Sequence, residues 1–331
     1  MARVFIEGFE SGDLSLWDGV ANPSNAYIQT PPPGFGSGNY CYYSTFATTG
    51  GIQKFLPSSP VYFMAVTYRS SNTGITALFS FNGGRGSTTL LKIGKDSTTQ
   101  FLKATTAGGT LLGTGTQACN VGQSRLIEVY YVPHLTNGQL IVKVDGYTDI
   151  SVSGAKTSDS TMNIDTLCLG DYANSTGGGY YDNLVIDNSE WIGQTFIAPL
   201  IVSGAGSSTQ WTPSTGLNYQ CVDEVPPSDT DFVSTITPSA LDLYLTSGIT
   251  TTVGVIKAVQ IQGRCWKEGI LTDKTISLAL KSGLTTSLSP AITIGFAATP
   301  LKTYLWQSNP STGNAFTQSE INSLQFGIEL L

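Results

Sequence analysis

Apolar and polar residues alternate with a period of two through most of this chain, and the helical period hardly appears. Successive side chains of a strand point to opposite sides, so this alternation is typical of strands with one buried face. We predict strands over residues 61–68, 76–81, 88–93, 126–132, 164–169 and 181–186 in the first half, and over 240–246, 253–266, 275–282, 291–296, 302–306 and 325–331 in the second. The chain is therefore expected to be all-β.

The clearest local signal is a tight hairpin. The alternating segments 140–144 and 147–152 are separated only by Asp145 and Gly146. Asp-Gly tolerates the positive φ angles of a two-residue turn, whose twist matches that of the flanking strands. The glycine-rich segment 83–86 is predicted to be another hairpin loop, because no Gly-Lys-Ser/Thr follows that would make it a phosphate-binding loop.

Two segments are expected to interrupt the strand pattern. Residues 171–180 contain three consecutive glycines, which do not fit a central strand, and we predict a flexible surface loop there. Residues 203–208 are small, and we predict that they are flexible as well.

The length of 331 residues suggests two domains, because domains commonly hold about 100–200 residues. A boundary is expected near residues 192–199, where the alternation stops before it restarts. We predict two antiparallel β-sandwich domains of jelly-roll type in series, over residues 1–195 and 196–331. One short helix is expected near the C-terminus, where Thr317 and Glu320 have the spacing of a capping box.

Charge is sparse in this chain. Charged residues make up 12% of the total and the formal net charge is −7. A negative field repels phosphate groups, and no run of Lys and Arg opposes it, so neither nucleic acid nor an anionic membrane surface is an expected partner. The N-terminus lacks the apolar core of a signal peptide, and no stretch approaches the roughly 20 apolar residues of a spanning helix. We expect synthesis in a cytosol and no membrane insertion.

The five cysteines are an odd number at wide, irregular spacing, and no CxxC or Cys/His cluster occurs. Such spacing is typical neither of a disulfide framework nor of a zinc site. We predict that Cys41, Cys119, Cys168, Cys221 and Cys265 are buried free thiols.

Several segments of the first half occur in a recognisable order. They are the opening residues 5–13, the central segments 125–129 and 142–146, and the closing segments 164–170 and 180–186. Together they resemble the laminin G-like, concanavalin A-like jelly-roll family over about residues 3–190. The resemblance implies a sandwich of two antiparallel sheets.

The second half resembles a β-rich module that follows such a domain in bacteriophage structural proteins. The matching segments are residues 208–213, 222–233, 258–261, 308–313 and 320–329. This resemblance implies a virion setting, on the head or on the tail.

We therefore expect a non-enzymatic bacteriophage virion structural protein, either a minor tail or adhesion component or a head-surface decoration protein. It would be assembled in the host cytoplasm and lie on the virion surface. Its partners would be capsid or tail proteins and copies of itself, in a homo-oligomer such as a trimer. The sparse charge favours such contacts, because burying a charge at an interface costs free energy unless it is paired.

No catalytic constellation is expected. A glycoside hydrolase, the weakest alternative, needs two carboxylates facing one cleft about 5–9.5 Å apart. Glu7 and Glu10 are three residues apart and would point to opposite faces of a regular strand. The single histidine, His134, is predicted to be an exposed loop residue without a nucleophile to activate. The prediction is that the chain is not an enzyme.

No cofactor is expected except calcium, which the resemblance leaves open. Laminin G-like domains sometimes hold this ion at the edge of the sandwich with oxygen ligands. Asp171, Asn174 and Asp182 bracket the glycine-rich segment and are the candidate ligands. The alternative is that these side chains bond their own backbone in turns.

A lectin-like carbohydrate-binding module that recognises a host-surface glycan is the main alternative function. Such a module needs aromatic side chains as flat platforms for sugar rings. Tyr40 and Tyr42 would share one face of a strand, and Tyr180 and Trp191 lie near the glycine-rich segment. The same aromatic residues would also suit a core or a protein interface, and the sequence leaves this choice open.

Overall fold

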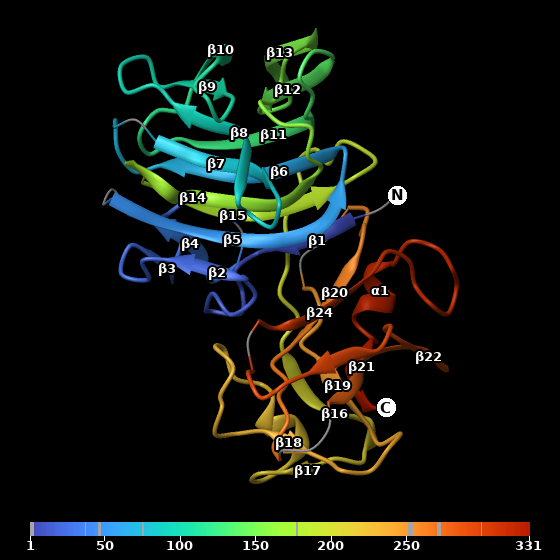
Figure 1. Cartoon of the computed structure of the whole chain (residues 1–331). Coiled ribbons are helices and arrows are strands. Elements are labelled where there is room, and N and C mark those ends of the chain that lie inside the picture. The colour runs from blue at the N-terminus through green and yellow to red at the C-terminus, as the bar shows by residue number, and fades with distance from the viewer. Residues whose placement is uncertain are drawn as a thin grey trace. The chain divides into compact units, whose positions relative to one another are not determined.

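The computed structural model describes residues 3–36, 38–45, 48–74, 76–176, 178–250, 254–269, 273–298 and 300–331, without the side chains of residues 48, 49, 76 and 171–176. The chain forms two compact units, Met1–Ile197 and Ala198–Leu331. Both are built from antiparallel strands (Figure 1), which confirms the prediction of an all-β fold. The longest helix in the described part of the chain has four residues, so none could cross a membrane.

The first unit contains two large sheets. Sheet A has the strand order β13-β12-β11-β6-β15-β4-β3, with β1 also paired to β15. Its strands are β1 (Arg3–Glu7), β3 (Ala26–Gln29), β4 (Cys41–Ser44), β6 (Tyr62–Ser70), β11 (Ser124–Val132), β12 (Gly138–Val144), β13 (Tyr147–Ala155) and β15 (Gly179–Asp187).

Sheet B has the order β10-β9-β8-β7-β14-β5-β2. Its strands are β2 (Gly19–Ala21), β5 (Thr48–Ser59), β7 (Thr76–Gly83), β8 (Thr88–Lys95), β9 (Phe101–Thr105), β10 (Leu111–Ala118) and β14 (Ile164–Thr176). The prediction did not include β2, β5, β9 or β10; the sequences of β5 and β10 are rich in Gly and Thr.

The core of the first unit lies between the two sheets. Tyr131 of sheet A stacks on Phe81 of sheet B, with ring centroids 5.8 Å apart. Tyr181 of β15 crosses the same space, and its hydroxyl donates to the backbone carbonyl of Leu78 on β7 at 2.9 Å. All these side chains are buried, as the period-two pattern predicts for the inner face of each strand.

The predicted tight hairpin is confirmed between β12 and β13. Val144 pairs with Tyr147, and both turn residues have positive φ angles, 51° at Asp145 and 84° at Gly146. The predicted hairpin loop over residues 83–86 joins β7 to β8.

The prediction of a loop over residues 171–180 is wrong. Strand β14 continues to Thr176 and pairs there with Thr48 of β5, and β15 begins at Gly179. Glycine is required at position 179 by packing, because a Cβ there would lie 2.4 Å from the ring of Tyr68. Gly179 thus allows a close contact at the start of β15.

The second unit is built on one six-stranded sheet, sheet C, and two short ribbons. Sheet C contains β16 (Val202–Thr209), β19 (Leu241–Thr246), β21 (Lys274–Ser282), β22 (Thr285–Leu288), β23 (Ile292–Ile294) and β25 (Gln325–Leu330). The ribbons are β17 (Thr212–Pro213) with β18 (Val233–Ser234), and β20 (Val259–Gly263) with β24 (Lys302–Trp306). Ile261 and Trp306 of the second ribbon share a core cluster with Leu278 of sheet C.

The predicted helix is confirmed as α1 (Gln318–Ile321). The Thr317 hydroxyl accepts from the Glu320 backbone N–H at 3.2 Å, and the Glu320 carboxylate accepts from the Thr317 N–H at 2.7 Å. These two bonds are the reciprocal pair of a capping box. A short 3₁₀ helix, η1 (Asn218–Cys221), was not predicted.

The prediction that residues 203–208 lie outside a strand is also wrong, because they form most of β16. Their small size has a packing reason. A Cβ at Gly206 would lie 2.5 Å from the backbone oxygen of Leu243 on the neighbouring strand. Small side chains therefore allow β16 to run close to β19.

The prediction for the five cysteines is confirmed, since each is buried as a free thiol. Burial raises the pKa of Cys41 and Cys265 to about 12 and that of Cys119 and Cys168 to about 11.

Candidate functional site

The outer face of sheet A carries three tyrosines in register on adjacent strands. Tyr27 of β3 pairs with Tyr43 of β4, and Tyr43 pairs with Tyr180 of β15. Residues that stand opposite one another on neighbouring strands point to the same side of a sheet, so the three rings form a transverse row. We call Tyr27, Tyr43 and Tyr180 the tyrosine row.

The rings of the tyrosine row touch one another. The centroids of Tyr27 and Tyr43 are 5.5 Å apart in an edge-on arrangement, and those of Tyr43 and Tyr180 are 4.7 Å apart and stacked. Tyr27 is 38% exposed, whereas Tyr43 and Tyr180 are half-buried. Partial burial, and then the neighbouring phenols Tyr43 and Tyr180, raise the pKa of Tyr27 above its ordinary value. The row is therefore an aromatic strip that is exposed at Tyr27 and half-buried at Tyr43 and Tyr180.

The row ends at an arginine. Arg69 of β6 stands opposite Tyr180, and Ser124 of β11 stands opposite Arg69 on the other side. The Nη1 of Arg69 donates to the backbone carbonyl of Pro33 at 2.8 Å. Aromatic rings and a guanidinium thus lie side by side on the outer face of sheet A.

The 30–40 loop borders the tyrosine row. Phe35 is 4% exposed and packs on Tyr180, with ring centroids 6.0 Å apart. The carboxylate of Glu10 anchors the end of the loop, because it accepts from the backbone N–H of Asn39 at 3.0 Å and from that of Tyr40 at 3.3 Å.

A shallow depression adjoins the other end of the row at Tyr27. It is lined by Gly12, Asp13, Leu14, Val20, Pro23, Ala26, Tyr27 and Ile28. The accessible surface around the row therefore extends past β3.

The other end of the same face is covered by the chain itself. The 188–197 segment follows β15 and places Trp191 against Phe63 and Tyr130, at centroid distances of 5.4 and 6.2 Å. The Lys143 ammonium lies 3.6 Å from the centre of the Trp191 ring. We call Phe63, Tyr130, Trp191 and Lys143 the covered cluster.

The predicted aromatic residues lie in different places. Tyr180 belongs to the tyrosine row and Trp191 to the covered cluster. Tyr42 is fully buried between Phe9 and Tyr181, so its prediction as a surface platform is wrong. Tyr40 is half-buried at the end of the 30–40 loop.

Tyr27 and Tyr43 were not predicted as site residues. The alternation around Tyr43 separates two faces but does not say which one is inside, because Tyr42 and Tyr43 are equally apolar. Their pairing with Tyr180 depends on strand register, which no local pattern shows.

The predicted calcium ligands are described only in part. Asp182 is fully buried, and its carboxylate accepts from the backbone N–H of Asn183 at 2.6 Å. The side chains of Asp171 and Asn174 lie outside the described set, so this site stays a prediction. Among the side chains that the structure does describe, no group of three or more His, Cys, Asp and Glu is placed to hold a metal ion.

The carboxylates considered for hydrolysis are bound to backbone amides. Glu7 is 2% exposed and accepts from the Phe9 N–H at 2.5 Å. Burial raises the pKa of Glu7 to about 8, and burial also raises the pKa of Glu10. His134 is exposed, as predicted, and its Nδ1 accepts from the Asn137 N–H at 2.8 Å.

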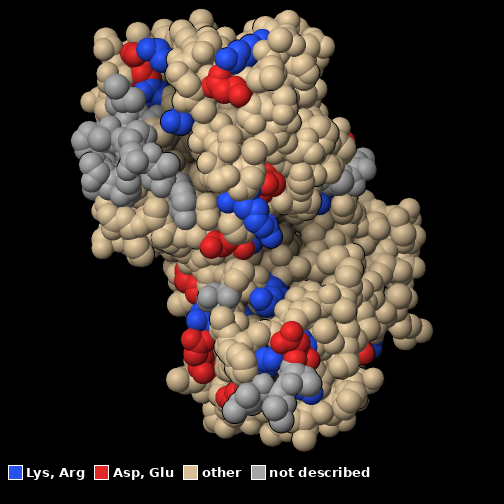
Figure 2. Space-filling view, viewed as in Figure 1, with Lys and Arg blue, Asp and Glu red and all other residues tan. Residues whose placement is uncertain are grey.

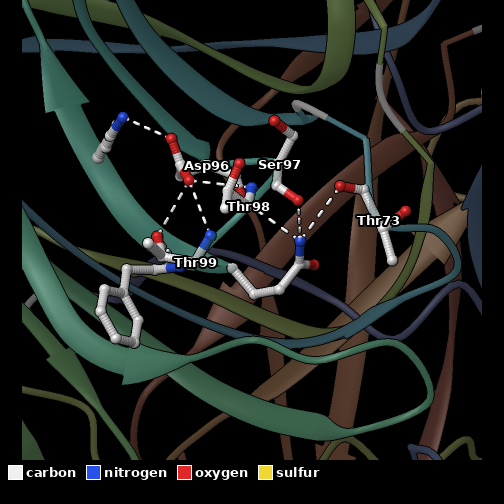
Figure 3. Close-up of polar contacts among 8 residues, drawn as sticks. Thr73, Asp96, Ser97, Thr98 and Thr99 are labelled. Carbon is white, nitrogen blue, oxygen red and sulfur yellow. Dashed lines mark hydrogen bonds and ion pairs between the residues drawn. The ribbon is translucent and has the colours of Figure 1, made fainter.

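A polar cluster lies at the turn between β8 and β9 (Figure 3). The Asp96 carboxylate accepts from Lys103 Nζ at 2.6 Å and from the Thr99 N–H at 2.8 Å, and these bonds hold its pKa well below the ordinary value. Gln100 Nε2 donates to the carbonyls of Ser97 at 2.7 Å and Thr73 at 3.1 Å.

Lys95, next to that turn, is 1% exposed, and burial lowers its pKa. Its Nζ donates to Ser70 Oγ at 2.6 Å and to the Asn72 carbonyl and Gln100 Oε1, both at 2.7 Å. An ammonium has three donors and all are used here. This cluster is therefore a closed structural network rather than an open site.

Comparison with known proteins yields structural matches only. A scan with family models finds no match, and a search of curated proteins finds none. Among solved structures, a cellulose-induced protein, Cip1, shares 14% identity over 58% of this chain and 100% of its own, with a TM-score of 0.43.

Two similar structures are polysaccharide lyases. An endo-β-1,4-glucuronan lyase from the fungus Trichoderma reesei shares 13% identity over 57% of this chain and 96% of its own, with a TM-score of 0.43. The alginate lyase Aly36B shares 13% identity over 58% of this chain and 100% of its own, with a TM-score of 0.40. These figures describe a distant likeness of fold and assign no role to any residue of this chain.

The expectation of a non-enzymatic virion structural protein is corrected by this comparison. The similar solved structures are named as polysaccharide lyases and a sialidase, and the expectation that the chain is not an enzyme is wrong on the same finding. The resemblance to phage structural proteins stays a prediction, and one sandwich fold serves many functions. The carbohydrate-binding alternative agrees better with the comparison.

Proposed function

We propose that the first unit is a carbohydrate-active β-sandwich that binds a glycan chain along the tyrosine row. The observation that carries this proposal is the contact of three tyrosine rings in register on adjacent strands. Sugar rings have apolar C–H faces that pack on aromatic rings, while their hydroxyls need polar partners nearby. The phenol groups of the row supply such partners.

The dimensions of the row suit an extended ligand. Neighbouring strands lie about 4.8 Å apart, so three strands give a strip about 10 Å long. That strip is long enough to contact more than one ring of an oligosaccharide.

The chain as a whole is also poor in charge, with 12% charged residues. Figure 2 shows Lys, Arg, Asp and Glu only in small, separated groups on the side that it draws. A glycan bound to a surface of this kind displaces few strongly hydrated charges, whose desolvation would cost free energy.

The test is glycan binding by the full chain and by Tyr43→Ala. Tyr43 touches both other rings of the row, so its loss interrupts the strip, and aromatic contacts are worth about 0.5–1.5 kcal/mol each. We expect the affinity for oligosaccharides found on a glycan array to fall about tenfold in this variant. The same samples should be assayed for shortening of the polymer, which would detect cleavage of the glycan chain.

The matched control is Tyr147→Ala. Tyr147 is 73% exposed and lies on β13, the edge strand farthest from β3 in sheet A. We expect this variant to bind like the unchanged chain. The proposal fails if the unchanged chain binds no glycan, or if Tyr43→Ala binds as tightly as the control.

A further inference from the structure

We propose that the tyrosine row, together with Arg69, selects glycans that carry an acidic group, a carboxylate or a sulfate ester, on the sugar that packs against Tyr180. The inference rests on the proposed function and names the ligand class of that same site. Three observations support it: the register of Arg69, the way its guanidinium is held, and its lack of an anionic partner.

Register places the guanidinium next to the platform. Arg69 and Tyr180 are directly opposite on neighbouring strands, and such residues have Cβ atoms about 4.5–5.5 Å apart. A substituent on a sugar ring that lies on Tyr180 is therefore within reach of the Arg69 side chain. Ser124 stands on the far side of Arg69, and its hydroxyl donates to the Gly34 carbonyl at 3.5 Å.

The guanidinium of Arg69 is held before any ligand arrives. Its Nη1 donates to the Pro33 carbonyl at 2.8 Å. Gly122 lies on the other side, where an added Cβ would be 3.8 Å from Nη2. One of the five N–H donors is thus used for positioning, and the others remain for a two-point contact with an oxyanion. A side chain that is already ordered loses less conformational entropy on binding.

The other arginines of the chain are satisfied internally. Ion pairs join Arg3 to Asp187 at 2.7 Å, Arg125 to Asp145 at 2.6 Å and Arg264 to Asp229 at 2.7 Å, and Arg85 lies over the ring of Phe55 at 4.8 Å. Within the described ranges, Arg69 forms no ion pair with any Asp or Glu. In a chain with a formal net charge of −7, a cation at the end of an aromatic strip is complementary to an anionic ligand.

The experiment compares three ligands of equal length and linkage: a polyuronate oligosaccharide, its counterpart with the carboxyl groups reduced to alcohols, and the sulfated form of that neutral counterpart. Binding to the full chain is measured by calorimetry for the unchanged protein, Arg69→Gln and Arg69→Lys. Arg85→Gln is the matched control, because it removes the same charge from the loop that joins β7 to β8 of sheet B.

We expect the unchanged chain to bind at least one acidic ligand about tenfold more tightly than the neutral one, as a charge-assisted contact would provide. Arg69→Gln should bring the acidic ligand down to the level of the neutral ligand. Arg69→Lys should keep part of the preference, because it retains the charge but not the planar guanidinium that can contact an oxyanion at two points. Arg85→Gln should behave like the unchanged chain. The acidic ligand that shows the preference identifies carboxylate or sulfate.

The inference is overturned if the unchanged chain binds acidic and neutral ligands equally, or if Arg69→Gln keeps the acidic preference. Both results leave glycan binding at the tyrosine row intact, whereas binding of none of the ligands by the unchanged chain would remove the proposed function itself. If Arg69→Gln does not fold, a salt series on the unchanged chain decides. The acidic preference should shrink between 0.05 and 0.5 M NaCl, on the order of a few-fold, and a preference indifferent to salt would overturn the inference.

Discussion

The outer face of sheet A has two ends that are built from the same kinds of side chain but are used differently. At one end the tyrosine row lies beside Arg69; Tyr27 is 38% exposed there, and Phe35 of the 30–40 loop packs on Tyr180. At the other end Phe63 and Tyr130 lie beside Lys143, and the chain covers them with its own Trp191. Aromatic rings with a neighbouring cation thus occur twice, once covered by Trp191 and once partly covered by the 30–40 loop, with Tyr27 left exposed.

The covered end shows how a segment of the chain can satisfy part of this face. The backbone N–H of Gly193 donates to the buried carboxylate of Glu128 at 2.8 Å, so the 188–197 segment also supplies a polar partner to the face. The Trp191 ring and the Gly193 N–H thus supply a flat ring and one hydrogen-bond donor to the covered end. A sugar ring with a polar substituent would supply the same two elements to the tyrosine row.

The largest expected effect concerns Glu7, and it tests whether a buried carboxyl group influences glycan affinity at the outer face of sheet A. Glu7 lies inside the sandwich, and burial raises its pKa to about 8, whereas an unfolded glutamate titrates near 4.3. The folded chain therefore keeps a proton that the unfolded chain has released. The stabilisation is complete below about pH 4.3 and is lost as the pH rises through about 8, with an upper limit on the order of 5 kcal/mol from 1.36 kcal/mol per pKa unit.

Urea unfolding at pH 5, 6, 7 and 8 should thus show the first unit losing stability with rising pH. Glu7→Gln is neutral at every pH and should flatten this slope. Glu320→Gln is the control, because backbone N–H bonding lowers the pKa of Glu320 and removes it from this range. Glycan affinity should not follow the stability curve. An affinity that changed in step with the slope would show that the tyrosine row is coupled to the core.

Much of the fold was accessible from local patterns. Alternation gave most strands of the two large sheets, because a strand with one buried side must repeat every two residues. The β12–β13 turn and the α1 cap were predictable since each depends on residues at most three positions apart. Strand β16 and the start of β15 were missed because Gly206 and Gly179 meet distant neighbours, Leu243 and Tyr68, which the sequence does not place beside them.

Less of the candidate site was accessible. Tyr180 was identified as an aromatic residue near the glycine-rich segment, but Tyr42 was chosen over Tyr43 because the inner face of β4 could not be assigned. Only the pairing register between β15 and β6 places Arg69 beside Tyr180, and the sequence does not show this register. The residues of this site come from four strands that are far apart in the sequence. No local sequence pattern in any one of these strands therefore indicates the site.

The second largest expected effect comes from a substitution in the covered cluster. Trp191→Ala removes the ring that packs on Phe63 and Tyr130, and we expect the first unit to lose about 2–3 kcal/mol, less than the 3–5 kcal/mol typical of a fully buried Trp. Thermal unfolding measures this loss. Glycan affinity should stay within about twofold, because the tyrosine row lies at the other end of the face.

Phe196→Ala is the control for that variant. It removes a large ring from the same 188–197 segment at a position that is 50% exposed, and we expect a loss below about 0.5 kcal/mol. Equal losses in the two variants would mean that Trp191 does not pack on the face. A new glycan-binding activity in Trp191→Ala would mean that the segment occludes a second platform.

The smallest expected effect compares the two cations directly. Lys143→Met removes the ammonium that lies over Trp191, and a partly exposed cation–aromatic contact is worth about 0.5–1 kcal/mol of stability. Arg69→Gln should cost less than about 0.5 kcal/mol of stability, because no ring or carboxylate of the described chain depends on it. Lys92→Met, at an exposed position of sheet B, corrects for the loss of a surface charge. If Lys143→Met matches Lys92→Met in stability but lowers the affinity for an acidic glycan, then Lys143 belongs to the ligand site, and the division of the face into a covered end and a ligand-binding end is wrong.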